Sequence, residues 1–267
     1  MNSVYSADLE NIKKILLNSN HAVFFGGAGV STDSGIPDFR GNGGLYDSKE
    51  ESNEYYLSSE CLENEPEKFF QFFRKNMVFE NAKPNGAHCA LSDLEKRGVI
   101  KAVITQNIDG LHQKAGSKHV IELHGASNRC YCTICGRVFT NGIITSHNDI
   151  PYCDKCGSLV RPDVTLYGEA LDGFNFADAR REISEADVLI VGGSSLVVNP
   201  AASLIREFRG EHLIIINYMP TPYDEMAEYL IRESISDVLS YFTKERLRSA
   251  DARILRQSRV SVLIERS

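Results

Sequence analysis

The sequence lacks any apolar run long enough to cross a membrane. Its longest strongly apolar stretch is HLIIIN, at residues 212–217, whereas a spanning helix needs about 20 apolar residues. The first ten residues, MNSVYSADLE, have neither a basic start nor an apolar core, so we expect no secretion signal. These two absences predict a cytoplasmic protein without a membrane partner.

An excess of positive charge is also lacking. The 267 residues include 36 Asp and Glu against 29 Lys and Arg, a formal net charge of −7. Proteins that bind nucleic acid across their surface usually have the opposite balance. We therefore expect no direct nucleic-acid partner, and a lysine-rich peptide would suit this surface better.

The seven cysteines, without a secretion signal, indicate a reducing compartment rather than disulfides. Four of them form two Cys-x-x-Cys pairs separated by seventeen residues, which is typical of a zinc site. Four thiolates leave no open position for water, so the Zn²⁺ ion would be structural. Cys130 could compete as a ligand, and we expect Cys61 and Cys89 in the core. The predicted ligands are Cys132, Cys135, Cys153 and Cys156.

Short runs rich in valine and isoleucine alternate with helical segments. Apolar runs without polar alternation are typical of strands buried on both faces of a parallel sheet. The alternation predicts an α/β fold, a doubly wound parallel Rossmann-like sheet. Strands are expected at 22–25, 99–105, 119–123, 187–193 and 213–217, and helices at 6–18 with Ser6 as cap, at 86–97, and from Asn199-Pro200 to Gly210.

Two stretches interrupt this alternation. Residues 42–80 predict a helical insert, and residues 126–160, which hold most of the cysteines, predict a zinc-binding module. Both would belong to a smaller domain. The Rossmann-like NAD-binding domain would be discontinuous, formed by residues 1–41, 81–125 and 161–242, with a basic tail at 243–267.

A glycine turn, GGAGVS, follows the first predicted strand. Backbone amides in such a turn can approach a diphosphate. The match to a dinucleotide fingerprint is imperfect, because Thr32 takes the place of the third glycine and the usual ribose-binding acid is missing. A purely structural turn is the alternative. The loop continues into SGIPDFRG, where an apolar ring lies between two charges: Asp38, Phe39 and Arg40.

Amide and carboxylate side chains follow the strand predicted at 99–105. Ligands bind beyond the carboxyl ends of strands in open α/β sheets, where such groups can hold a carboxamide and ribose hydroxyls. The alternative is a turn held by local hydrogen bonds. His124 follows the next predicted strand, a place where a lone histidine is more often structural. The first group is Gln106, Asn107, Ile108 and Asp109.

Six motifs together resemble the bacterial-type sirtuin family of NAD-dependent protein-lysine deacylases, over about residues 6–240. They are GAGVSTDSGIPDFRG, TQNIDGLH, ELHG, YGEAL, GSSLVVNPA and IIN. The resemblance implies that an acyl group passes from lysine to ADP-ribose while nicotinamide leaves NAD⁺. An apolar ring on a closing loop suits the shielding of a reactive ribose, and an imidazole suits proton removal near neutral pH.

The resemblance also implies residue roles. His124 would be the general base, Asn107 would act with it in catalysis, and Phe39 would shield the ribose. The implied NAD⁺ contacts are Gly27, Ala28, Gly29, Thr32, Asp38, Phe39, Arg40, Gln106, Asn107, Ile108, Asp109, Gly193, Ser194, Ser195 and Asn217.

The segment RPDVTLYGEAL, at 161–171, resembles the family's substrate-binding strand, whose backbone pairs with the acyl-lysine peptide. A subgroup that removes acidic acyl chains carries a tyrosine and an arginine three residues apart. Phe72 and Lys75 are predicted at the matching places, which favours acetyl without excluding an acidic chain. The implied substrate contacts are Thr165, Leu166, Tyr167, Gly168 and Glu169, of which the first two depart from the family's usual valine and phenylalanine.

Three other functions are alternatives to a deacylase. A hydride-transferring dehydrogenase would share the glycine turn but would leave Asn107, Asp109 and His124 unexplained. A zinc-ribbon module for nucleic acid is disfavoured by the acidic charge. Protein ADP-ribosylation is the serious alternative, because both reactions begin with loss of nicotinamide. The sequence leaves the protein substrate, the oligomeric state and the role of the tail open.

Overall fold

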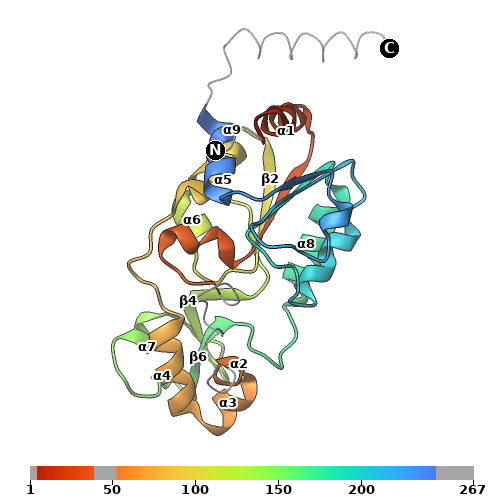
Figure 1. The fold of residues 1–267 in the computed structure, drawn as a ribbon. Helices are drawn as coiled ribbons and strands as arrows, with labels where there is room; N and C mark the ends of the chain where they lie inside the picture. The colour runs from red at the N-terminus through yellow and green to blue at the C-terminus, as the bar shows by residue number, and fades with distance from the viewer. Residues whose placement is uncertain (1–4, 39–52, 245–267) are drawn as a thin grey trace, which may run out of the picture.

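The centre of the protein is a parallel sheet, seen in a computed structural model that describes residues 5–38 and 53–244 (Figure 1). The strand order β3-β2-β1-β7-β8-β9 reverses direction between β1 and β7. Such a reversal is the switch point at which doubly wound folds bind ligands. The strands are β1 (Ala22–Gly26), β2 (Ile100–Thr105), β3 (Val120–Glu122), β7 (Val188–Gly192), β8 (His212–Ile216) and β9 (Tyr229–Ile231). The predicted fold class is confirmed.

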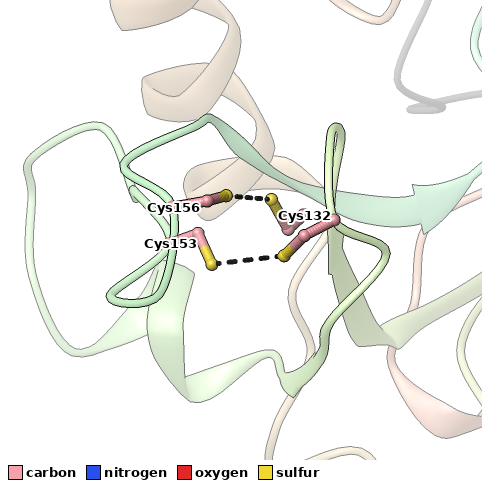
Figure 2. A group of neighbouring side chains, drawn as sticks. Cys132, Cys153 and Cys156 are labelled. Atoms are coloured by element: carbon pink, nitrogen blue, oxygen red, sulfur yellow. Dashed lines mark hydrogen bonds between the residues drawn. The ribbon is translucent and has the colours of Figure 1, made fainter.

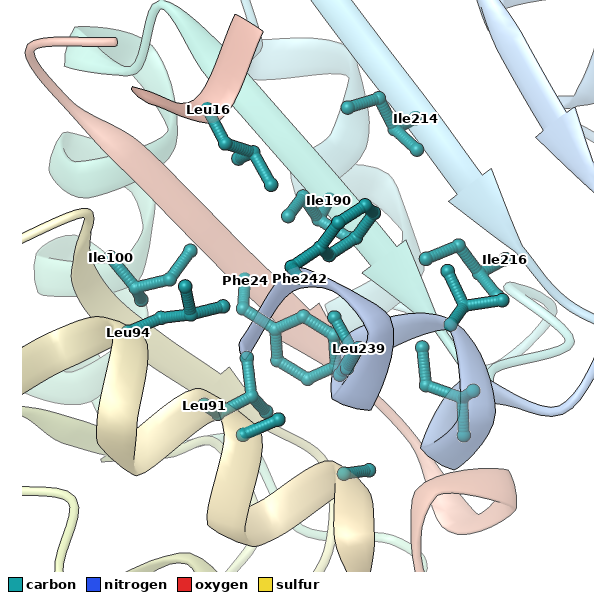
Figure 3. Packing of buried hydrophobic residues seen from close by; sticks show 14 of the residues in the cluster. Leu16, Phe24, Leu91, Leu94, Ile100, Ile190, Ile214, Ile216, Leu239 and Phe242 are labelled. Atoms are coloured by element: carbon teal, nitrogen blue, oxygen red, sulfur yellow. The ribbon is translucent and has the colours of Figure 1, made fainter. Parts of the chain in front are cut away.

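Helices cover both faces of the sheet. On one face, α1 (Ser6–Asn18), α5 (Gly86–Lys96) and α9 (Ile235–Lys244) pack around Phe24 and Ile190 (Figure 3). On the other face, α8 (Gly173–Glu185) and the 3₁₀ helix η4 (Ala201–Glu207) pack against Val23 and Phe25. Successive residues of β1 therefore enter different cores, which explains the uninterrupted apolar run.

Several local predictions need correction. Ser6 is the first residue of α1 and not its cap, because Tyr5 holds the cap position without a side-chain hydrogen bond. The helix predicted after Asn199-Pro200 is a 3₁₀ helix, since both the amide and the hydroxyl of Ser203 bind the carbonyl of Pro200. The edge strand β9 was not predicted, because its run of three residues is too short to stand out.

A smaller unit packs beyond the sheet (Figure 1). Its antiparallel sheet has the order β5-β4-β6. Phe69, Phe70 and Phe73 of α4 share one hydrophobic core with Cys130 and Val160, so two segments distant in sequence form one unit. Its elements are α2 (Asn53–Tyr56), α3 (Ser59–Asn64), α4 (Pro66–Asn76), β4 (Gly125–Cys132), β5 (Val138–Thr140), α7 (Gly142–Thr145) and β6 (Val160–Val164).

The remaining short elements lie in loops of the larger unit. They are η2 (Ala28–Val30), η3 (Thr32–Ser34), α6 (Leu111–Ala115) and η5 (Asp224–Met226). Across residues 5–38 and 53–244, none of the helices has the length and apolarity needed to cross a membrane. Phe39, Arg40 and the tail from residue 245 lie outside the described residues.

Candidate functional site

A cavity of about 520 Å³ lies at the carboxyl edge of the parallel sheet. Loops that follow five of the strands contribute to its wall, because parallel strands bring their carboxyl ends to one edge. One cavity-lining residue from each of these loops is Ala28 after β1, Gln106 after β2, His124 after β3, Ser194 after β7 and Asn217 after β8.

Most of the residues predicted for the site line this cavity. Thr32 does not, because its side chain is exposed and donates to the carbonyl of Gly29 at 3.1 Å. Gly27 is also absent from the cavity wall. The predicted residues that line it are Ala28, Gly29, Asp38, Gln106, Asn107, Ile108, Asp109, His124, Thr165, Leu166, Tyr167, Gly168, Glu169, Gly193, Ser194, Ser195 and Asn217.

The glycines after β1 permit close packing against the loop after β7. The amide of Gly27 donates to Gly192 at 3.2 Å, and that of Gly29 donates to Gly193 at 2.8 Å. A Cβ atom on Gly29 would lie 2.8 Å from the Cα atom of Gly193. These two amides are therefore bound within the protein, and a diphosphate would have to meet other donors of the turn.

Ser31 joins two of the predicted site residues, although sequence reasoning missed it. Its buried hydroxyl donates to Asp109 Oδ2 at 2.7 Å and accepts from Asn107 Nδ2 at 3.1 Å. The other carboxylate oxygen of Asp109 accepts from the amide of Leu111 at 2.9 Å. This bond uses one of the two N–H groups on Asn107 Nδ2 and fixes the orientation of the side-chain amide at the cavity wall. The only sequence signal was a hydroxyl residue at the end of the glycine turn GGAGVS.

His124 is held in the tautomer that a general base requires. Its Nδ1 lies 2.8 Å from the carbonyl oxygen of Gln106. A carbonyl can only accept, so Nδ1 carries the proton and Nε2 carries the lone pair. Burial lowers the pKa of His124 below its ordinary value of 6.5, although the bond to Gln106 opposes this shift. The imidazole is therefore neutral at pH 7.

Two further histidines lie behind Ser31, where α5 packs on α6. The rings of His88 and His112 are fully buried with centroids 4.7 Å apart. His88 Nδ1 accepts from the amide of Asn85 at 3.3 Å, which directs its Nε2–H toward Ser31 Oγ, 3.5 Å away. Burial lowers the pKa of His88 to about 4 and that of His112 to about 3. At pH 7 both rings are therefore neutral. His88 lies next to Ser31, and His112 packs against His88.

The four predicted zinc ligands converge in the smaller unit (Figure 2). All four sulfurs lie within 4.8 Å of one another, with 3.3 Å between Cys132 and Cys156 and 3.7 Å between Cys135 and Cys153. Zn–S bonds of about 2.3 Å in a tetrahedron imply sulfurs roughly 3.8 Å apart, so the cluster fits one structural zinc.

The other cysteines lie outside this cluster. Cys130 is buried in the core of the smaller unit, where burial raises the pKa of its thiol to about 12, and its sulfur is not one of the four that converge. Cys61 is buried as expected. The expectation for Cys89 is wrong, because it is exposed on the outer side of α5.

The predicted substrate-binding strand is shorter than expected. β6 ends at Val164, and the chain then turns, because the carbonyl of Leu166 accepts from the amide of Glu169 at 3.0 Å. Glu169 lines the cavity but also binds Arg161 and the amide of Leu166. Burial alone would raise the pKa of Glu169, yet these bonds lower it below its ordinary value. The turn is thus held by a charged pair.

The predicted acyl-pocket positions on α4 also need correction. Phe72 stacks on Tyr56 with ring centroids 5.2 Å apart, and Lys75 is exposed. Neither lines the cavity, whereas Phe73 and Asn76 do. The face of α4 that meets the cavity is therefore one residue further along the helix than the sequence suggested.

Comparison with known proteins agrees with this geometry. The model of the Sir2 family matches residues 27–200. A protein of Clostridium acetobutylicum named NAD-dependent protein deacetylase is 52% identical over 235 residues, covering 86% of this chain and 96% of the relative. A protein of the same name from Staphylococcus aureus is 48% identical over 241 residues, covering 89% of this chain and 99% of the relative.

Solved structures are similar over the same extent. One described as a Sir2 homolog–NAD complex has a TM-score of 0.79 and 40% identity, covering 88% of this chain and 92% of the other. Another, described as Sir2 bound to acetylated peptide, has a TM-score of 0.78 and 36% identity, covering 88% of this chain and 97% of the other.

Proposed function

The chain belongs to the Sir2 family, the sirtuins, and on that premise we propose that it is an NAD-dependent protein-lysine deacetylase. The observation that carries the proposal is the buried His124, with its lone pair on Nε2, in the same cavity as Asn107 and Asp109. One acyl-lysine, one NAD⁺ and one water would give lysine, nicotinamide and an acyl ester of ADP-ribose.

Bound NAD⁺ would supply the electrophilic ribose carbon and the hydroxyl that receives the acyl group. The chain's own residues would bind NAD⁺ and remove the proton from its hydroxyl. Asn107, which is held in place by Ser31 and through it by Asp109, would bind the nicotinamide carboxamide with its side-chain amide. His124 Nε2 would take a proton from a ribose hydroxyl, because its other nitrogen is bound to Gln106. The proposed NAD⁺ contacts are the cavity-lining residues that follow β1, β2, β7 and β8.

The structural zinc would take no part in the reaction and would affect this site only by stabilising the smaller unit. Its four ligands belong to the smaller unit, whose core also supplies Phe73 and Leu166 to the cavity wall. Acetylated lysine in protein substrates is the proposed partner. A cytoplasmic location is part of the same proposal, supported by the cysteines of the described ranges, none of which forms a disulfide.

Mass spectrometry of a reaction with NAD⁺ and an acetyl-lysine peptide tests the proposal. We expect free lysine, nicotinamide and acetyl-ADP-ribose, with nicotinamide release dependent on the acylated peptide. Release with unmodified protein alone, leaving ADP-ribose on that protein, would establish ADP-ribosylation instead. His124→Ala should abolish acetyl-ADP-ribose formation while the melting temperature stays close to that of the wild type.

A further inference from the structure

Resting on the proposed deacylase function, we propose that Arg129 is a positioning residue that ties the smaller unit to the larger one, so that a peptide held by the smaller unit meets His124. Arg129 lies in β4 and does not line the cavity. Its guanidinium binds one carboxylate from each unit, Glu122 of β3 and Asp163 of β6.

His124 lies on the link between the two sheets. β3 ends at Glu122 in the parallel sheet, and β4 begins at Gly125 in the sheet of the smaller unit. The amide of Thr165, directly after β6, donates to the carbonyl of His124 at 3.0 Å. The proposed base and the proposed substrate segment therefore meet at this link, and a change in the angle between the units would alter their separation.

β4 contacts the larger unit through a bulge. In the pairing of β4 with β6, three residues of β4 lie between two that face adjacent residues of β6. These three residues, 127–129, have no partner on β6, and such bulges redirect side chains next to active sites. Ser127 uses its amide and its hydroxyl to bind the carbonyl of Ile108, at 2.8 and 2.9 Å. The bulge is thus a docking surface for the larger unit, and Arg129 is its charged residue.

The guanidinium of Arg129 uses a different nitrogen for each carboxylate. Nη1 donates to Glu122 Oε2 at 2.8 Å, and Nε donates to Asp163 Oδ2 at 2.9 Å. Glu122 is 8% exposed, and its other oxygen accepts from Gln113 Nε2 at 2.7 Å, which anchors this end in the larger unit. Asp163 lies two residues before Thr165. The planar guanidinium therefore links the larger unit to the strand that leads into the substrate segment.

The two substrates should depend on this link to different extents. The proposed NAD⁺ contacts follow β1, β2, β7 and β8 of the larger unit, whereas the proposed peptide contacts at 165–169 follow β6. Without Arg129, the arrangement that suits both would be less populated, and the apparent dissociation constant of the peptide rises by the same factor. Saturating peptide, which would contact both units, restores that arrangement, so kcat is preserved.

Steady-state kinetics of the full chain with an acetyl-lysine peptide test the inference. The Arg129 side chain is 44% exposed, so water weakens each bond. We expect Arg129→Ala to raise KM for the peptide roughly three- to tenfold, with kcat and KM for NAD⁺ within about twofold of the wild type. Arg129→Lys keeps the charge but has a single nitrogen, so its KM for the peptide should lie between the two.

The matched control is Arg180→Ala, which breaks an arginine ion pair with Glu207 between α8 and η4, inside the larger unit. It should leave KM for the peptide unchanged. An unchanged KM in Arg129→Ala, an equal rise in Arg180→Ala, or an equal rise in KM for NAD⁺ and for the peptide would overturn the inference.

Hydrogen exchange separates this inference from the proposed function. Two amide bonds lie at the boundary between the units, from Thr165 to His124 and from Ser127 to Ile108. In Arg129→Ala both amides should exchange at least about threefold faster, while amides of β1 and β8 exchange as in the wild type. No turnover by the wild type would reject the deacetylase function, yet faster exchange would still support Arg129 as the link. Unchanged exchange would overturn the inference whatever the turnover.

Discussion

Ser31 donates its hydroxyl proton to Asp109, with 2.7 Å between Oγ and Oδ2, while accepting a bond from Asn107. Replacing Ser31 with alanine removes both bonds and frees the Asn107 side chain. Hydrogen bonds to charged groups contribute about 1.5–3 kcal/mol, so we expect nicotinamide release to slow by roughly 10- to 100-fold. Single-turnover assays would measure it. Ser184→Ala on the exposed side of α8 is the control, and an equal loss there would contradict the assignment.

The loss of deacetylase activity at low pH should reflect the protonation of His124. Its protonated form cannot act as a base, so kcat/KM falls as pH drops through the pKa of the free enzyme. Because burial lowers that pKa below 6.5, we expect half-maximal kcat/KM at a pH under 6.5. A steady-state profile with the acetyl-lysine peptide measures this midpoint. A midpoint at or above 6.5 would mean that another group limits the rate.

Acid should also destabilise the fold through the two histidines behind Ser31. Their folded-state pKa values are lowered to about 4 and about 3. At pH 7 both states of the chain hold neutral rings. As pH falls below 6.5 the unfolded state gains protons first, so stability is lost. Between pH 7 and pH 5 the free energy of unfolding should fall by about 2–4 kcal/mol.

Urea unfolding at several pH values would measure this slope. His112→Phe removes one buried ring nitrogen pair and should make the slope shallower. His147→Gln changes an exposed histidine and should leave it as in the wild type. Identical slopes in all three proteins would show that other groups cause the acid sensitivity.

Loss of one zinc ligand should unfold the smaller unit. Cys156→Ser breaks the four-sulfur cluster, and structural zinc contributes directly to folding. We expect the metal-to-protein ratio to fall from one toward zero and the melting temperature to drop by about 10–20 °C. Cys89→Ser, at an exposed thiol outside the cluster, should change neither. A Cys156→Ser protein that keeps one zinc per chain would disprove the ligand set.

The pair of Arg161 and Glu169 should matter for stability as well as for the cavity. Glu169→Gln removes the hydrogen-bonded counter-charge of Arg161, a residue that is 9% exposed. Because Glu169 is partly solvated, we expect a loss of about 1–3 kcal/mol. Urea denaturation measures the loss, with the exposed Glu185→Gln as the matched control. No difference between the two would show that the pair is screened by water.

The parts of the site that sequence alone predicts are those encoded locally. The cysteine spacing requires two knuckles, and Gly136 and Gly157 complete each turn with positive φ angles of 68° and 73°. Strand runs such as residues 22–25 are apolar on both sides because each side meets a different core. Residues that follow such strands meet at one edge, which is why the loops after β2 and β3 could be assigned to one cavity.

What the sequence did not reveal depends on tertiary packing. The run KFFQFFRK places aromatic residues on neighbouring faces of α4, so periodicity cannot choose between Phe72 and Phe73. The stacking of Phe72 on Tyr56 makes that choice. Ser31 is one hydroxyl among several in its loop, and only the approach of the loop after β2 distinguishes it. The edge strand β9 is extended mainly because β8 offers it a partner.

The position of β1 in the middle of the sheet has a consequence for synthesis. β1 pairs with β2, which starts at Ile100, and with β7, which starts at Val188. A ribosome that adds about 5–20 residues per second would expose β1 for roughly 8–30 s before β7 is made. During that time the apolar run at 22–25 keeps at least one unpaired edge, because its partner β7 is still missing after β2 has been made, so a nascent chain needs protection from aggregation until its central strand is flanked.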